Sequence, residues 1–195
     1  MEQRIFDFIH QGIEAKMQAG EVLAPAIIEA SQMVVESLLN DNKVLVCASG
    51  LAAANGMTFS ALLNNRHTYE RPSLPAITLG VDPVSSSAIT LDMGLHEIFS
   101  RQIRALAQPG DTLLVLSGGQ ASSSLIQAIS AAHDRQAQVI ALSSQIDHDI
   151  TSVLDNNDLS IVIPCDQIAQ IHELQQMVVF CMSELIDEQL FGGMA

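Results

Sequence analysis

The residues of this chain that could do chemistry are serines and glycines placed after two predicted strands. Ser49 and Gly50 follow the apolar strand that ends at Cys47, and Ser117 opens a second turn farther along. Backbone N–H groups at the start of a helix are unpaired and carry a partial positive charge, so a phosphate could bind there without a basic side chain. The pattern therefore indicates a pocket for an anionic group such as a phosphate.

The second turn is rich in hydroxyl groups. Ser122 and Ser123 stand at the predicted start of a helix, and Ser124 follows them. Neutral hydroxyl donors at a helix N-terminus can hold a phosphate, whereas plain capping of the helix needs only one serine and is the alternative role. We predict that a phosphate or sugar phosphate would contact Ser49, Ser117, Ser122 and Ser123.

The helix predicted after Gly50 carries no nucleophile, general base or metal ligand. Its turns hold small and apolar residues, among them Ala52, Thr58 and Leu62. Proton transfer requires a titratable group within hydrogen-bond reach of the reacting atoms. We therefore predict no catalytic residues, no bound metal and no cofactor.

Composition limits the kinds of partner. The chain has 195 residues, of which 48% are hydrophobic, and a formal net charge of −14. The negative charge would repel nucleic acid and an anionic membrane, so we expect neither as a direct partner. Its three cysteines fit neither a disulfide framework nor a zinc site. The N-terminus has no apolar signal region and no stretch is expected to span a bilayer, so we predict a cytoplasmic protein.

The order of predicted elements indicates an α/β fold. Five strand candidates lie at residues 43–47, 75–79, 112–116, 138–142 and 159–163. Helical patterns separate most of them, at residues 51–65, 95–107 and 122–134. This alternation predicts a five-stranded parallel sheet with helices on both faces, and ligand sites in such sheets lie beyond the carboxyl ends of the strands.

Helices at the two ends of the chain are expected to mediate oligomerisation. We predict one domain over residues 1–195, with N-terminal helices in 1–40, an α/β core in 43–165 and a C-terminal helix in 167–191. The first region shows two helical patterns, and Pro25 suits the first turn of the second. The last helix has an apolar stripe broader than one contact face requires, so we expect these helices to form a bundle between copies.

Three segments resemble SIS-domain proteins of the phosphoheptose isomerase group. The likeness rests on the turn after Cys47, on the segment Glu70-Arg71-Pro72-Ser73-Leu74-Pro75-Ala76-Ile77, and on the stretch LSGGQASSSLIQAI at residues 116–129. It covers nearly the whole chain. The resemblance implies the SIS fold, which is flavodoxin-like, and a homotetramer whose active sites lie between subunits.

The resemblance also implies that the residues of the enzymes' active site are missing. The phosphate-facing serine of the first turn corresponds to Ala52, and the histidine and glutamate that serve metal binding and proton transfer correspond to Thr58 and Leu62. A glutamine and a histidine near the C-terminus correspond to His172 and Phe180. Losing a positioned acid or base costs about 10²–10⁴-fold in rate. The resemblance therefore predicts a chain without enzymatic activity.

One alternative would retain chemistry near the last helix. His172 and Glu173 could rebuild a site with His96 or Asp92. Adjacent helix positions diverge by about 100°, however, so a solvated helix face is the favoured interpretation.

Two segments resemble the branch of the group that associates with the replication initiator DnaA. They are residues 71–77 and residues 185–191 at the end of the last helix. The resemblance implies that Leu190 and Phe191 bind DnaA, with acidic residues as an electrostatic rim. The alternative is a hydrophobic contact that stabilises the helix end before a glycine.

These observations predict a non-catalytic homotetrameric scaffold that binds DnaA and promotes its assembly at the chromosomal origin. Four copies of a modest site would raise the local concentration of bound partners. Two alternatives remain open. The chain could be a sedoheptulose 7-phosphate isomerase of lipopolysaccharide heptose biosynthesis, or a regulator that senses a sugar phosphate through Ser117 and Ser122.

Overall fold

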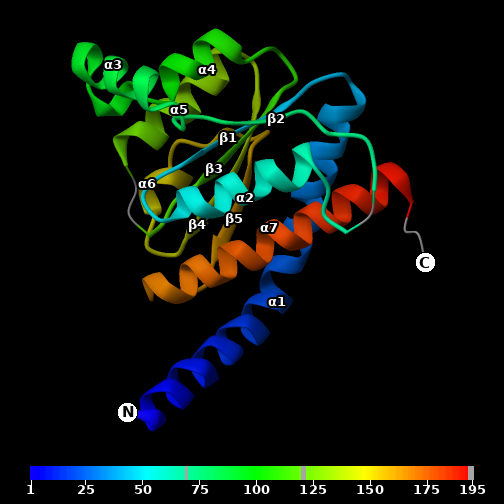
Figure 1. Ribbon diagram of the computed structural model, residues 1–195, viewed down its shortest axis with the longest axis vertical. Helices are drawn as coiled ribbons and strands as arrows, with labels where there is room; N and C mark the ends of the chain where they lie inside the picture. Colours follow the sequence, from blue (N-terminus) through cyan, green and yellow to red (C-terminus); the bar gives the residue numbers. More distant parts are fainter. Residues whose placement is uncertain (69, 120–121, 193–195) are drawn as a thin grey trace.

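The computed structural model describes residues 1–68, 70–119 and 122–192, and it confirms the predicted α/β fold with a parallel sheet of five strands (Figure 1). The strands lie side by side in the order β2-β1-β3-β4-β5. Their bounds are Val44–Ala48 for β1, Ala76–Thr78 for β2, Thr112–Leu116 for β3, Gln138–Ser144 for β4 and Leu159–Ile163 for β5. In this order β1 and β3 flank the point where the connections change direction, which is where ligands bind in open α/β sheets.

Alternation along the strands divides the core into two layers. Val44 and Val46 of β1 join one buried cluster, and Leu45 and Cys47 join the other. The first layer is covered by α1 (Glu2–Leu39), α2 (Ala52–Asn64) and α7 (Ile168–Phe191). The second is covered by α4 (Ser100–Leu106), α5 (Ser123–Asp134) and α6 (His148–Thr151). Because helices cover both faces of the sheet, side chains on both sides of its central strands are buried, and the sequences of these strands are nearly continuous apolar runs.

The N-terminal region differs from its prediction. The two expected helices are one helix, α1, and Pro25 lies inside it rather than in a first turn. Proline removes one hydrogen bond from the helix ladder. The buried stripe nevertheless continues across Pro25 from Leu23 to Ile27 and packs against α7, so tertiary contacts outweigh the lost bond.

The N-terminal half of α1 extends past the sheet (Figure 1). This half of the helix exposes apolar side chains. Its exposed apolar side chains are Ile5, Phe6, Phe8, Ile9, Ile13 and Met17. Within the described residues, one helix, α1, is long enough and apolar enough to cross a membrane. This differs from our expectation that the chain has no such stretch. Core helices of soluble proteins and N-terminal signal sequences meet the same criterion.

Of the three helical elements between β2 and β3, the first two lie at the periphery. They are α3 (Pro83–Met93) and the 3₁₀ helix η1 (Leu95–Glu97). The side chain of Asp82 accepts a hydrogen bond from the Val84 N–H at 2.9 Å and so caps α3. No residue of α3 is buried.

Candidate ligand-binding site

A cavity of about 330 Å³ lies beyond the carboxyl ends of β1 and β3. Its walls come from the turn after β1, the turn after β3 and the first turns of α7. The lining residues are Ser49, Gly50, Leu51, Gly118, Ser122, Ile168 and His172. The cavity therefore occupies the topological switch point, the position at which this class of sheet binds small molecules.

The first wall is a tight turn held by backbone hydrogen bonds. Gly50 has a φ of +56°, a left-handed conformation that glycine adopts without steric cost. The Ser49 N–H donates to the Leu116 carbonyl at 3.2 Å, and the Ala52 N–H donates to the Ser49 carbonyl at 3.2 Å. The turn is thus fixed to the end of β3, and Ser49 lines the cavity as a consequence.

The second wall brings Ser117 and Ser122 to the same region, but not in the same way. Ser122 is the N-cap residue of α5, yet its hydroxyl makes no capping bond and pairs instead with the Ser124 hydroxyl at 2.8 Å. Ser117 is fully buried and is not among the lining residues, and its Oγ has no hydrogen-bond partner among the described residues. Ser123 is exposed and is not among the lining residues. Residues 120–121, part of the stretch that carried the resemblance, lie outside the described residues.

A buried amide network ties the two walls to α7. Asn55 of α2 donates through Nδ2 to the His172 carbonyl at 3.0 Å and to Gln175 Oε1 at 3.4 Å. Gln175, which is fully buried, donates through Nε2 to the Ser117 carbonyl at 2.5 Å. Sequence reasoning missed Asn55 and Gln175. Their signal is a pair of amides on otherwise buried faces of two helices, where an unpaired polar group would be costly.

The positions that the resemblance assigns to acid–base and metal chemistry hold no such groups. Thr58 Oγ1 donates to the Ala54 carbonyl at 2.8 Å, and Leu62 packs against the core. The Phe180 ring lies 5.7 Å from the His67 ring between centroids. Within the described ranges, no group of three or more His, Cys, Asp or Glu side chains could hold a metal ion. The described residues therefore do not fit a metal of the kind that the resemblance implies, and the absence of a cofactor stays a prediction.

Cys47, at the end of β1, is the nearest thiol in sequence to the first wall. It is fully buried, and burial raises the pKa of the thiol well above its ordinary value. A thiol that stays protonated is a poor nucleophile. Cys47 is therefore a core residue.

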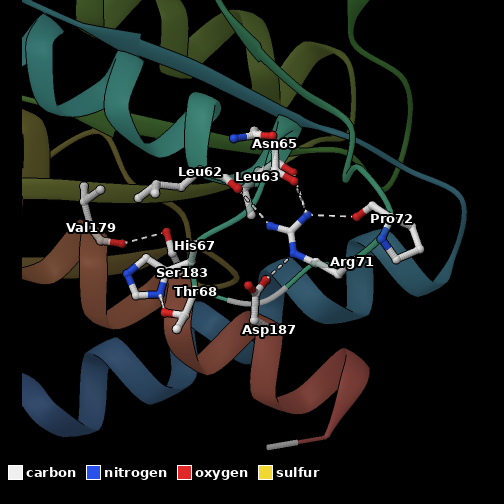
Figure 2. Close-up of polar contacts among 10 residues, drawn as sticks. All are labelled: Leu62, Leu63, Asn65, His67, Thr68, Arg71, Pro72, Val179, Ser183 and Asp187. Atoms are coloured by element: carbon white, nitrogen blue, oxygen red, sulfur yellow. Dashed lines mark hydrogen bonds and ion pairs between the residues drawn. The ribbon is translucent and has the colours of Figure 1, made fainter. Parts of the chain in front are cut away.

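The segment that follows α2 is anchored to the end of α7 by Arg71 (Figure 2). Arg71 Nε donates to Asp187 Oδ1 at 2.7 Å, and both side chains are buried. The other guanidinium nitrogens donate to the carbonyls of Leu62 at 2.8 Å and Leu63 at 2.9 Å. Arg71 thus satisfies carbonyl groups at the C-terminus of α2 and joins that terminus to α7.

The predicted partner-binding residues Leu190 and Phe191 end α7 and differ in their surroundings. Leu190 packs against the hydrophobic core. Phe191 is 42% exposed, and its ring centroid lies 5.8 Å from the guanidinium carbon of Arg71. Of the two, Phe191 is the side chain that is free to contact another molecule.

The chain is similar along nearly its whole length to isomerases. The SIS domain family model matches residues 7–144. The phosphoheptose isomerase of Chromohalobacter salexigens is 43% identical over 192 residues, which are 98% of each chain. That of Shewanella sp. strain ANA-3 is 39% identical over 191 residues, covering 98% of this chain and 97% of the other.

Solved structures agree with these relatives. The structure of a phosphoheptose isomerase from Francisella tularensis gives a TM-score of 0.90 at 33% identity, and the match covers 95% of this chain and 97% of that one. The phosphoheptose isomerase of Neisseria gonorrhoeae gives 0.88 at 31% identity, and the match covers 96% of this chain and 98% of that one.

These comparisons contradict the prediction of a chain without enzymatic activity. Relatives 39–43% identical over nearly the full length carry the name of an enzyme. The prediction gave the residues at Leu62 and Phe180 more weight than the likeness of the whole chain. This chain belongs to the SIS-domain family and, within it, to the phosphoheptose isomerase group.

Proposed function

We propose that this chain binds a sugar phosphate in the cavity between the Ser49 turn, Ser122 and His172, and interconverts its ketose and aldose forms. The observation that supports the proposal most is the cavity itself, which lies at the switch point and is lined by hydroxyl groups next to a helix N-terminus. The names of the relatives indicate the substrate class, and sedoheptulose 7-phosphate is the ketose that we assign.

Neutral donors would hold the phosphate. The lining residues include no Lys or Arg, and the chain carries a net charge of −14, so the protein field as a whole repels an anion. Free N–H groups and the dipole at the start of α5 offset this locally, and the Ser49 and Ser122 hydroxyls are additional donors. The phosphate end of the substrate is therefore assigned to the α5 side of the cavity.

The reaction moves one proton between adjacent carbons. A base takes the proton from C1 of the ketose, the electrons of that bond form the C1=C2 double bond, and the C2 oxygen gains a proton. The enediol then loses the O1 proton and gains one at C2, which gives the aldose. The resemblance to the group implies active sites between subunits, so we assign the acid–base groups of this step in part to a second copy of the chain.

Turnover of sedoheptulose 7-phosphate tests the proposal. The purified protein, with and without added Zn²⁺, is expected to convert the ketose into the aldose heptose 7-phosphate, followed by NMR. Ser122→Ala removes a cavity hydroxyl and is expected to lower kcat/KM about tenfold, the effect of one hydrogen bond to a charged group. Ser130→Ala, on an exposed position of the same helix, is the matched control and should leave kcat/KM unchanged. Absence of aldose at stoichiometric enzyme would contradict the proposal.

Docking of DnaA is a second candidate, and the exposed Phe191 ring favours it. The neighbouring Glu188 is also exposed, so the end of α7 offers an aromatic side chain with an acidic rim. Aromatic side chains of this kind often dominate a protein interface. Assembly of DnaA at an origin through several copies of this chain would follow from multivalency.

Phe191→Ala is expected to weaken binding of purified DnaA at least about tenfold, as loss of an aromatic anchor does. Binding is measured by surface plasmon resonance. Leu190→Ala is not a clean probe, because Leu190 packs against the core. Met57→Ala, which truncates an exposed side chain on α2, is the control. No binding by the unaltered chain, or equal binding by the folded Phe191→Ala variant, would remove this candidate.

A homotetramer is part of both candidates. The exposed apolar face at the N-terminal half of α1 supports self-association, because contiguous apolar patches of this kind mark interfaces. Light scattering of the purified chain measures the mass directly.

A further inference from the structure

Resting on the sugar-phosphate site proposed above, we infer that Asn55 and Gln175 are positioning residues, which set the spacing between the walls of the cavity without contacting the ligand. Neither residue is among those that line the cavity. The two residues are 7% and 0% exposed, so water does not compete for their hydrogen bonds. Their amides form one chain of hydrogen bonds, which joins α2 behind the first wall to the end of β3 and to the start of α7.

This chain of hydrogen bonds has a single favourable orientation. Gln175 donates through Nε2 to the Ser117 carbonyl at 2.5 Å and accepts through Oε1 from Asn55 Nδ2 at 3.4 Å. Asn55 Nδ2 also donates to the His172 carbonyl at 3.0 Å. A reversed Gln175 amide would place its oxygen against the Ser117 carbonyl, where neither group has a proton to donate. The walls can therefore shift relative to one another only if buried hydrogen bonds break, which is costly.

Gly56, the next residue of α2, sets how closely that helix approaches the sheet. A Cβ atom there would lie 3.1 Å from Val46 Cγ1 and 3.4 Å from Leu116 Cδ1. These two side chains belong to β1 and β3, the strands that lead into the two turns. The helix thus packs directly on both strands, and Asn55 is held at a fixed height above them. Its amide carries the position of the sheet to α7.

The kinetic effect of a displaced wall differs from that of a less stable fold. The phosphate end of the substrate does not change during the isomerisation, so a wall that holds it binds the ground state and the transition state equally. Displacing that wall raises KM and leaves kcat unchanged. A residue that acts on stability alone lowers the folded fraction of the enzyme, which reduces the apparent kcat at constant KM. The two kinetic constants therefore distinguish positioning from stabilisation.

Steady-state kinetics with sedoheptulose 7-phosphate test the assignment. Gln175→Leu removes both hydrogen bonds of the side chain and is expected to raise KM about tenfold, while kcat changes by less than about twofold. Asn55→Ala acts on the same chain of bonds, so the double variant should raise KM by less than the product of the two single effects. Asn64→Ala is the matched control on α2, because that amide donates to the Ala76 carbonyl at 3.0 Å, away from the cavity. It should leave KM unchanged.

Hydrogen exchange measures the positioning without turnover. The Ser117 N–H donates to the Leu142 carbonyl at 3.0 Å, and in Gln175→Leu it is expected to exchange about tenfold faster, because the end of β3 has lost its bond to α7. Asn64→Ala should not change this rate. An unchanged rate, an unchanged KM for folded Gln175→Leu, or a lower kcat at constant KM would overturn the assignment and leave the proposed function standing. If the natural chain does not convert sedoheptulose 7-phosphate, the proposed function fails and this assignment fails with it.

Discussion

Asp187→Ala is expected to lower the free energy of unfolding by about 3–5 kcal/mol, the cost of leaving one member of a buried ion pair without its partner. Asp187 accepts from Arg71 Nε at 2.7 Å, and the two side chains are 9% and 3% exposed. The guanidinium would stay buried with a charge that nothing balances. Equilibrium unfolding in urea measures the loss.

An exposed ion pair in the same chain is the control. Lys16 Nζ lies 3.0 Å from Glu173 Oε2, and the two side chains are 47% and 37% exposed. Solvent screening reduces such pairs to about 0–1 kcal/mol, so Lys16→Ala should change the free energy of unfolding by no more than that. A similar small loss for Asp187→Ala would contradict the role given to the buried pair.

The double variant Arg71→Met with Asp187→Leu separates charge from packing. Replacing a buried pair by apolar residues of similar volume is often close to neutral. Arg71 also donates to the carbonyls of Leu62 and Leu63, which the double variant leaves unsatisfied. We therefore expect the double variant to be more stable than Asp187→Ala but less stable than the natural chain.

Phe59→Ala is expected to cost about 3–5 kcal/mol of unfolding free energy, the range for truncating a fully buried aromatic side chain. Phe59 lies on α2, is completely buried and belongs to the cluster between the sheet and α7. The truncation would leave a cavity beneath the helix that carries Asn55, so the site would loosen as well. Urea unfolding measures the stability change.

Met57→Ala on the same helix is the matched comparison, because Met57 is 51% exposed. Exposed substitutions away from special features change stability by about 0.5 kcal/mol or less. If Phe59→Ala and Met57→Ala lowered the free energy of unfolding equally, α2 would not be packed as described.

The strands could be predicted from the sequence because each is a buried apolar run bounded by turn residues. Residues 112–116 and 159–163 were predicted with the bounds that β3 and β5 have. The helix α3 was not predicted, since it buries no residue and so has no apolar period, although Asp82 and Pro83 form a standard helix start. Pro25 led to the opposite error, because two helices were predicted where there is one. The hydrogen bond that Pro25 removes costs less free energy than the packing of α1 against α7 contributes.

The site could be predicted only in part. Ser49 and Ser122 were found because hydroxyls after parallel strands meet at one edge of the sheet. The hydrogen bond between Asn55 and Gln175 joins residues 120 positions apart, and no local pattern signals such a pair. The enzyme prediction failed for a related reason. It considered single positions such as Leu62, and a sequence does not show which groups the fold or a second copy brings to the same cavity.

A crystal structure of the chain grown with sedoheptulose 7-phosphate tests the central claim most directly. We predict the ligand in the cavity between the Ser49 turn and His172, with its phosphate next to the Ser122 hydroxyl and the start of α5. An empty cavity at saturating ligand, or a ligand bound elsewhere on the chain, would contradict it.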